Sequence, residues 1–265
     1  MKQVQIGVIG GTRGMGRWFA RFLRKQGFAV AVCDEKTKLT PAELAGSCDV
    51  VVVSVPIGKT VGIIEAIGPL LHQESLLMDL TSLKEDPVKA MLGATRAEVV
   101  GCHPLFGPDV ASIRDNNIIL CPARGDAWLS FLKELFVACG ARVTMSSPEE
   151  HDRMMSLIQG LTHFNTILME LAIRDSGKEP SELEAFSTPI FRTKRSLSAR
   201  VFGPNANLYA AILTKNPHIM EVVERYEKNL FLMKKCIADG DTAGLAKLLN
   251  NKNRPNKTSP GQLPG

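Results

Sequence analysis

The chain has 265 residues, of which 45% are hydrophobic and 22% are charged, so it is too apolar for a disordered protein and long enough for one or two globular domains. Its net charge of +5 comes from scattered basic residues, which argues against a nucleic-acid-binding protein. No apolar run reaches the length of a membrane span, and the N-terminus has no signal-peptide pattern. The six cysteines form no CxxC pair, so we expect free thiols, no metal site and a cytoplasmic location.

The first 145 or so residues alternate short apolar runs with amphipathic segments. Runs rich in Val and Ile predict strands at 4–10, 29–34, 49–56, 75–80, 98–104, 117–123 and 141–145. These runs lack polar alternation, as expected for a parallel sheet that is covered on both faces. We therefore predict an α/β fold whose first domain, residues 1–146, is a doubly wound Rossmann-type parallel sheet.

The pattern changes at SSPEEHD, residues 146–152. Ser147, the following Pro148 and two glutamates are typical of a helix start. From there to about Leu249 every apolar run has helical length or period. We predict an all-helical second domain over 147–250 and a disordered, Pro- and Gly-rich tail over 251–265.

A glycine-rich loop, VIGGTRGMG, separates the first strand from a helical segment. Such glycines allow a tight turn and let backbone N–H groups at a helix N-terminus approach a pyrophosphate. The loop is one residue longer than GxGxxG, and Thr12 stands near the place of the second glycine. We expect a dinucleotide to contact Gly10, Gly11, Thr12, Arg13, Gly14, Met15, Gly16, Asp34 and, after the third strand, Ser54, Val55 and Pro56.

Asp34 ends the second strand, where a carboxylate would hydrogen-bond the adenosine ribose of NAD and repel the 2′-phosphate of NADP. Arg13, Lys36 and Lys38 lie nearby in the sequence and could bind that phosphate instead. NAD is therefore the expected cofactor, with NADP as the alternative.

Polar residues follow several of the other predicted strands, in DLTSLK (79–84) and GCHPLFGP (101–108). Ligands of doubly wound sheets bind at the carboxyl ends of the strands. A simple binding module has little use for polar side chains at several of these ends, so the pattern favours an enzyme. Taken alone, His103 fits a structural role as well as a catalytic one.

The segments GGTRGMG, MDLTSLK, GCHPLFGPD, EEHDRMMSLIQGLTHFNT and FSTPIFRTKRSLSAR occur in the order seen in prephenate dehydrogenases. Over residues 4 to 230 the chain resembles the short archaeal-type members of that family. The resemblance implies oxidative decarboxylation of prephenate to 4-hydroxyphenylpyruvate, with hydride transfer to NAD(P)+, in tyrosine biosynthesis. No chorismate mutase segment is evident, so we expect a monofunctional enzyme.

The resemblance also implies roles for individual residues. His103 would accept the C4-hydroxyl proton of prephenate, and Ser82 would hydrogen-bond nearby, although Ser82 could also cap a helix beginning near Lys84. Lys84 would lie near the substrate or else on the surface. Because prephenate carries two carboxylates, Arg200 and Arg192 are its expected partners. Arg200 would hold the ring carboxylate, while Arg192 could form an inter-helix ion pair instead.

Three further histidine and glutamine positions come from the helical part. Gln159 and His163 lie four residues apart on one helix face, and the resemblance brings His163 against the substrate, although a core histidine is the alternative. We expect a structural role for His151 at a helix start. The remaining polar residues that we expect only on the surface are His72, Lys194, Arg195 and His218.

The long apolar faces of the helical part predict a homodimer, with a monomer as the alternative. Arogenate or 4-amino-4-deoxyprephenate could replace prephenate as the substrate. A dinucleotide-responsive regulator without turnover would keep the pocket, but it would need no base facing C4. A generic β-hydroxyacid dehydrogenase would require a catalytic lysine in the second domain, and its motif is missing here.

Overall fold

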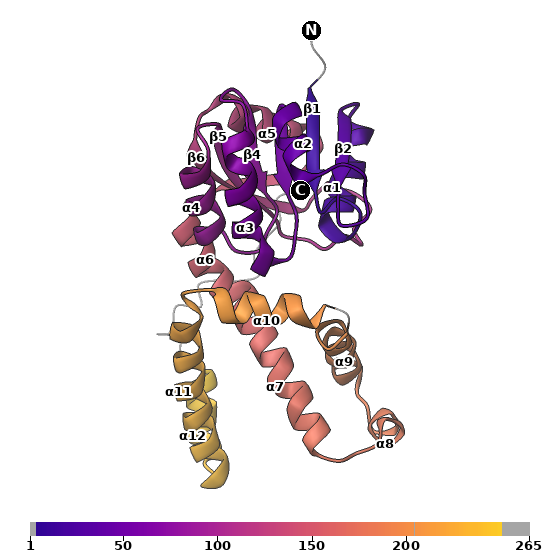
Figure 1. Ribbon diagram of the computed structural model, residues 1–265. Coiled ribbons are helices and arrows are strands. Elements are labelled where there is room, and N and C mark those ends of the chain that lie inside the picture. Colours follow the sequence, from indigo (N-terminus) through magenta and orange to yellow (C-terminus); the bar gives the residue numbers. More distant parts are fainter. Residues whose placement is uncertain (1–3, 204, 251–265) are drawn as a thin grey trace. The chain divides into compact units, whose positions relative to one another are not determined.

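The computed structural model describes residues 4–203 and 205–250 of the chain. A seven-stranded sheet with helices on both faces is followed by helices alone (Figure 1). The strands are β1 (Gln5–Ile9), β2 (Ala29–Cys33), β3 (Val50–Val53), β4 (Leu76–Asp79), β5 (Glu98–Pro104), β6 (Asn117–Arg124) and β7 (Arg142–Met145). All seven coincide with predicted runs. The tail predicted to be disordered, 251–265, lies outside the described residues.

The strand order is β2-β1-β3-β4-β5-β6-β7, and β1 to β5 run parallel to one another. The predicted parallel sheet is confirmed over β1 to β5, whereas β6 pairs antiparallel with β5, and β7 is parallel to β6. A parallel neighbour needs a crossover connection, usually a helix. Residues 105–116 between β5 and β6 contain no helix, so the chain turns back on itself directly after His103.

The sheet separates two apolar core layers. On one face, Val8 and Met78 pack with Phe19 of α1 (Gly14–Lys25) and Phe136 of α5 (Ala127–Ala138). The opposite face packs against α2 (Pro41–Ser47), α3 (Ile57–Ile67) and α4 (Glu85–Ala94). The short 3-10 helix η1 (Gly68–Leu70) contacts these three helices. Because both faces are covered, the strands are apolar on both sides.

The helical part begins with α6 (Pro148–Met155), as predicted from the sequence. Ser147 is its N-cap, and the serine hydroxyl accepts from the backbone N–H of Glu150 at 3.1 Å. The chain continues through the π-helical turn η2 (Ser156–Leu161), α7 (Thr162–Asp175), α8 (Pro180–Ala185), α9 (Pro189–Val201) and α10 (Ala206–Lys215). No strand occurs among the described residues after Met145, so this part is all helical.

The chain divides into two compact units at Ile219/Met220. The first contains the sheet and the helices up to α10. The second consists of nearly all of α11 (Ile219–Ala238) together with α12 (Thr242–Leu249). No helix among the described residues is long and apolar enough to cross a bilayer. All six cysteines are free thiols, as expected.

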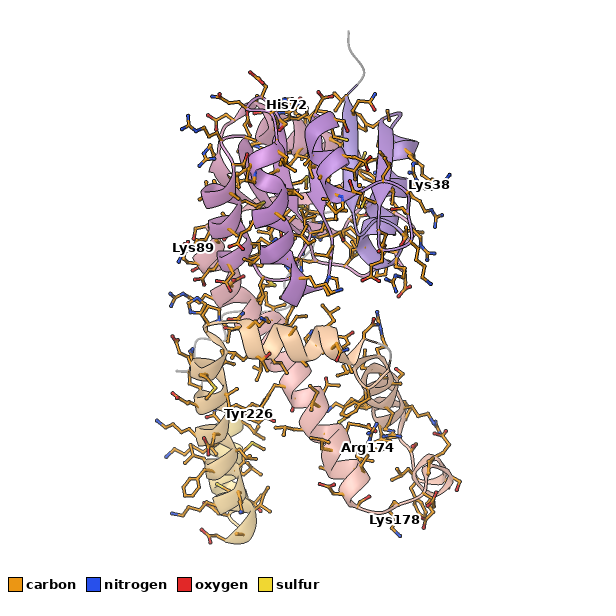
Figure 2. The ribbon with its side chains drawn as sticks, in the orientation of Figure 1. Lys38, His72, Lys89, Arg174, Lys178 and Tyr226 are labelled. Atoms are coloured by element: carbon orange, nitrogen blue, oxygen red, sulfur yellow. The ribbon has the colours of Figure 1, made fainter. Side chains whose placement is uncertain are left out.

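Charged side chains lie around the outside of the sheet part, where Figure 2 labels Lys38 and Lys89. Lys36 and Lys38 are both exposed beyond β2. Neither forms an ion pair with another described residue.

Candidate active site

The glycine loop joins β1 to α1 and lies against the end of β3. Gly10 has φ +81°, and a Cβ there would stand 2.1 Å from the Ser54 carbonyl oxygen. A Cβ at Gly16 would meet the Gly10 carbonyl at 2.3 Å. These two contacts explain why only glycine fits, and they bring the predicted cofactor residues of both segments together.

The N-terminus of α1 has neither a capping side chain nor an acidic residue in its first turn. Its first N–H groups are therefore available to an anion. A Cβ at Gly14 would meet nothing within 4 Å, so the loop is open at the same point. The loop thus fits the pyrophosphate of a dinucleotide.

Asp34 follows β2 and faces this loop. Its carboxylate accepts from the Thr12 hydroxyl and, at 3.3 Å, from the Thr12 backbone N–H. These bonds, with the Thr12 hydroxyl as the largest contribution, lower the pKa of Asp34. Arg13 lies 3.9 Å from both Asp34 and Glu35, so its charge is shared between two carboxylates. Asp34 and Glu35 thus form an acidic pair beside the glycine loop.

His103 lies in β5, one residue before the strand ends, and only 4% of its surface is exposed. Its Nδ1 is 2.8 Å from Nε2 of His151, and Nδ1 of His151 is 2.7 Å from a carboxylate oxygen of Asp152. The three side chains form a buried row from the end of β5 into α6. His151 lies near the start of α6, as expected from the sequence. It is also in direct contact with the candidate catalytic histidine, which the sequence did not predict.

The Asp152 carboxylate also caps another helix. It accepts the backbone N–H of Lys84 at 2.8 Å and that of Glu85 at 3.0 Å, at the start of α4. A carboxylate that receives these donors can only accept from His151. A neutral His151 then carries its proton on Nδ1, its Nε2 accepts from Nδ1–H of His103, and Nε2 of His103 keeps a lone pair.

That free nitrogen of His103 faces Gln159, whose side-chain amide nitrogen is 3.4 Å away. Gln159 belongs to the π-helical turn η2, which interrupts the helical run between α6 and α7. Such turns are frequent at functional sites. The other amide atom of Gln159, Oε1, is buried without a hydrogen-bond partner among the described residues.

Burial of the ring lowers the pKa of His103 well below its usual value, and the neighbouring His151 and Lys84 add to the effect. The imidazole is therefore neutral near pH 7, which is the form that can accept a proton.

Lys84 is completely buried, so the alternative of a surface lysine is wrong. Its ammonium donates to the Asp79 carboxylate, to the Cys102 carbonyl at 3.0 Å and to the Thr81 hydroxyl at 3.4 Å. An ammonium has three donors, and these three acceptors use all of them. In this structure Lys84 binds β5 next to His103 through the Cys102 carbonyl, and its contact with a substrate stays a prediction.

Ser82 is half-buried between β4 and α4, and its side chain hydrogen-bonds to none of the residues that the structure describes. The alternative that Ser82 caps the following helix is wrong, because Lys84 is the N-cap residue and Asp152 supplies the capping carboxylate. Hydrogen bonding of Ser82 near His103 stays a prediction.

The two arginines of α9 have different surroundings. Arg200 is exposed beside the turn that follows β5, with its Nη2 3.8 Å from Asp109 and 3.8 Å from a Cβ built at Gly107. Arg192 donates to Glu184 of α8 at 2.7 Å, which is the inter-helix ion pair left open by the sequence. Of these two arginines, Arg200 is the one that lies at the turn following β5 and His103.

A further arginine of α9 was wrongly expected to be solvated. Arg195 donates at 2.6 Å to Glu170, a buried carboxylate of α7. The same carboxylate binds Arg174, which is labelled in Figure 2 and stacks 4.2 Å above the Phe202 ring. Sequence spacing alone gave no signal for this network, because its members come from different helices.

His163 does not contact His103 directly. Its ring packs edge-on against Tyr209 of α10 at 4.6 Å between centroids, and burial lowers its pKa. His218, expected only on the surface, is 2.7 Å from Glu85 in the first turn of α4. The structure thus separates His163 from the buried row and adds His218 near its far end.

Trp18 of α1 was also missed from the sequence. Its indole N–H donates to the Val110 carbonyl at 2.8 Å, and its ring packs edge-on against Phe106 at 4.9 Å. Trp18 therefore joins the helix behind the glycine loop to the turn that follows His103. These contacts connect the segment of the glycine loop to the segment of the candidate base.

Two family models match the chain. Residues 20–145 match the nucleotide-binding domain of prephenate dehydrogenase, and residues 147–251 match the dimerization domain of the same family. The chain belongs to the prephenate dehydrogenase family.

Curated relatives agree with this membership. A probable arogenate/prephenate dehydrogenase of Methanocaldococcus jannaschii is 34% identical over 263 residues, covering 92% of this chain and 59% of the relative. The T-protein of Haemophilus influenzae is 34% identical over 220 residues, covering 83% of this chain and 58% of that protein. The chain thus spans under two thirds of the length of these two relatives.

Solved structures of the family share the fold. The A. aeolicus prephenate dehydrogenase in complex with hydroxyphenyl propionate and NAD+ has a TM-score of 0.76 at 20% identity, with 95% of this chain and 96% of that chain covered. The Synechocystis arogenate dehydrogenase has a TM-score of 0.70 at 19% identity, with coverages of 94% and 98%.

The buried Lys84–Asp79 pair gives a stability prediction. Lys84→Met leaves the Asp79 carboxylate buried without its counter-charge, so we expect the free energy of unfolding in urea to fall by about 3–5 kcal/mol. In the double variant Lys84→Met/Asp79→Leu no unpaired charge remains, and most of that loss should be recovered. A double variant as unstable as the single one would contradict this account of the pair.

Proposed function

We propose that the chain catalyses the NAD+-dependent oxidative decarboxylation of prephenate to 4-hydroxyphenylpyruvate. The single observation that carries the proposal is the buried His103 imidazole at the end of β5, whose Nε2 lone pair faces away from the His151–Asp152 row. A neutral base at this position suits a substrate whose ring hydroxyl must lose a proton.

NAD+, when bound, supplies the hydride acceptor. The glycine loop, the uncapped N-terminus of α1 and Asp34 are the residues that would hold it. The family's nucleotide-binding domain and the NAD+ complex of the A. aeolicus relative support this choice of cofactor.

His103 accepts the C4-hydroxyl proton at Nε2 as C4 becomes carbonyl-like and its hydride departs. Since decarboxylation makes the ring aromatic, the product provides the driving force and the protein needs only a well-placed base. The low exposure of His103 keeps bulk water from competing for that proton.

Arg200 binds the ring carboxylate until it leaves as CO2. A guanidinium offers two parallel N–H donors to a carboxylate, and the Asp109 carboxylate 3.8 Å away orients this side chain without a close hydrogen bond. Arg192, Ser82, Gln159 and His163 are proposed as further substrate contacts, among which Gln159 has the direct contact with His103.

The protein acts as a homodimer in this proposal. The match of residues 147–251 to the family's dimerization domain supports it. Large apolar side chains are also exposed, with Phe186 at 90% and Ile190 at 72% in the first unit and Phe231 and Ile237 at 67% in the second. Exposed apolar side chains in such numbers are typical of interaction surfaces.

The experiment that tests the proposed reaction follows reduced nicotinamide by absorbance, with prephenate or arogenate as substrate and NAD+ or NADP+ as cofactor. We expect turnover with prephenate, faster with NAD+ than with NADP+ because Asp34 and Glu35 repel a 2′-phosphate. Turnover with arogenate alone would change the substrate and keep the mechanism. Cofactor binding without turnover in any combination would overturn the proposed reaction in favour of a regulator or an aminodeoxy substrate.

Two substitutions separate the proposed base from the proposed carboxylate partner. His103→Asn removes the base, so kcat should fall by roughly 10²–10⁴-fold with little change in KM. Arg200→Ala removes charge-assisted hydrogen bonds from binding, so KM should rise by about tenfold or more. Steady-state kinetics of both variants, with Arg142→Ala of β7 as an exposed-arginine control, give the comparison. Equal effects of the two variants on kcat and KM would contradict the assigned roles.

A further inference from the structure

His151 and Asp152 lie behind the proposed base and have no part in the reaction as described so far. They are 2% and 1% exposed, respectively, and they connect directly to the ring of His103. A buried imidazole between a base and a carboxylate could orient the base only, or it could also receive a proton from it. The hydrogen-bond directions decide which is feasible.

In the resting state each bond of the row has one available direction. The backbone amides of α4 and Nδ1–H of His151 donate to Asp152, and Nδ1–H of His103 donates to Nε2 of His151. The Nε2 atom of His151 is thus the acceptor of this hydrogen bond, 2.8 Å from the Nδ1 atom of His103 that carries the proton. A proton can cross this bond without any side chain moving.

We propose that His103 and His151 act together as a two-histidine proton relay. When His103 gains a proton from the substrate, it passes a different proton on to His151. This inference rests on the proposed function. The substrate O–H bond breaks, and its proton bonds to Nε2 of His103. The Nδ1–H bond of His103 breaks in turn, and that proton bonds to Nε2 of His151. No electron is gained or lost by either ring, and the hydride leaves separately for the cofactor.

The charge distribution favours the relay. A positive charge on His103 would lie buried near the ammonium of Lys84, which is held at the Cys102 carbonyl next to it in the chain. On His151 the same charge would be in contact with the Asp152 carboxylate at 2.7 Å. The remaining charged groups near the row are paired with each other: Lys84 with Asp79, and Glu85 with His218.

Gln159 can hydrogen-bond Nε2 of His103 both before and after the proton transfer. Its amide nitrogen can donate to the lone pair of Nε2 in the resting state. After the transfer Nε2 carries a proton, and a half-turn of the same amide brings the partnerless Oε1 to accept it. One side chain therefore serves His103 before and after proton transfer.

The test uses the full chain with prephenate and NAD+ under single-turnover conditions, so that the chemical step is observed. His151→Gln retains an acceptor for Nδ1–H of His103 but cannot take up its proton. We expect the single-turnover rate of His151→Gln to fall by about 100-fold or more, with KM for prephenate and the Kd for NAD+ within about twofold of wild type. The matched control is His72→Gln, an exposed histidine labelled on the outer surface in Figure 2, and it should leave all three quantities unchanged.

A proton inventory in mixtures of H2O and D2O gives the second readout. Two protons moving together in wild type should produce a curved dependence of the rate on deuterium fraction, and His151→Gln should give a straight one. A wild-type rate in His151→Gln, or a straight line in wild type, would overturn the relay. A fall in rate together with a higher KM and a weaker NAD+ affinity would also overturn the relay, because it would indicate a structural role for His151. Absence of turnover in wild type would instead overturn the proposed function.

Discussion

The geometry of the candidate active site depends on one buried carboxylate. Asp152 binds the first two backbone N–H groups of α4 and, through His151, the ring of His103. A carboxylate at a helix N-terminus is stabilised by the helix dipole and by the unpaired N–H groups there. Since Asp152 belongs to α6, this interaction also fixes the first helix of the helical part onto the sheet. Attachment of the helices and orientation of the base have the same physical cause.

Two other constraints act on the same strand end. The Lys84 ammonium donates a hydrogen bond to the Cys102 carbonyl of β5, and the Trp18 indole N–H donates to the Val110 carbonyl in the following turn. The position of His103 is thereby fixed by the buried Lys84–Asp79 ion pair on one side and by α1, the helix after the glycine loop, on the other. In the proposed reaction a hydride donor and its acceptor must meet at a defined distance and angle, which requires such fixed positions.

The sequence predicted the elements better than it predicted the contacts between them. Strands, the glycine loop and the start of α6 at Ser147 follow from local rules of apolar runs, turn residues and capping. The direction of β6 depends instead on how residues 105–116 connect it to β5. The burial of Lys84 was missed because one of its acceptors, the Cys102 carbonyl, belongs to the next strand, β5. The contact of Gln159 with His103 requires a π-helical turn, which has no clear sequence signal.

The central claim is that the Asp152–His151 pair holds His103 with its proton on Nδ1 and a lone pair on Nε2. Nitrogen NMR of the protein labelled with 15N at histidine rings measures this directly, with His103 assigned by the signals lost in His103→Asn. Near neutral pH the account predicts a protonated Nδ1 and an unprotonated Nε2 for His103. A protonated Nε2 in the free protein would contradict the account, because His103 could then accept no proton from the substrate.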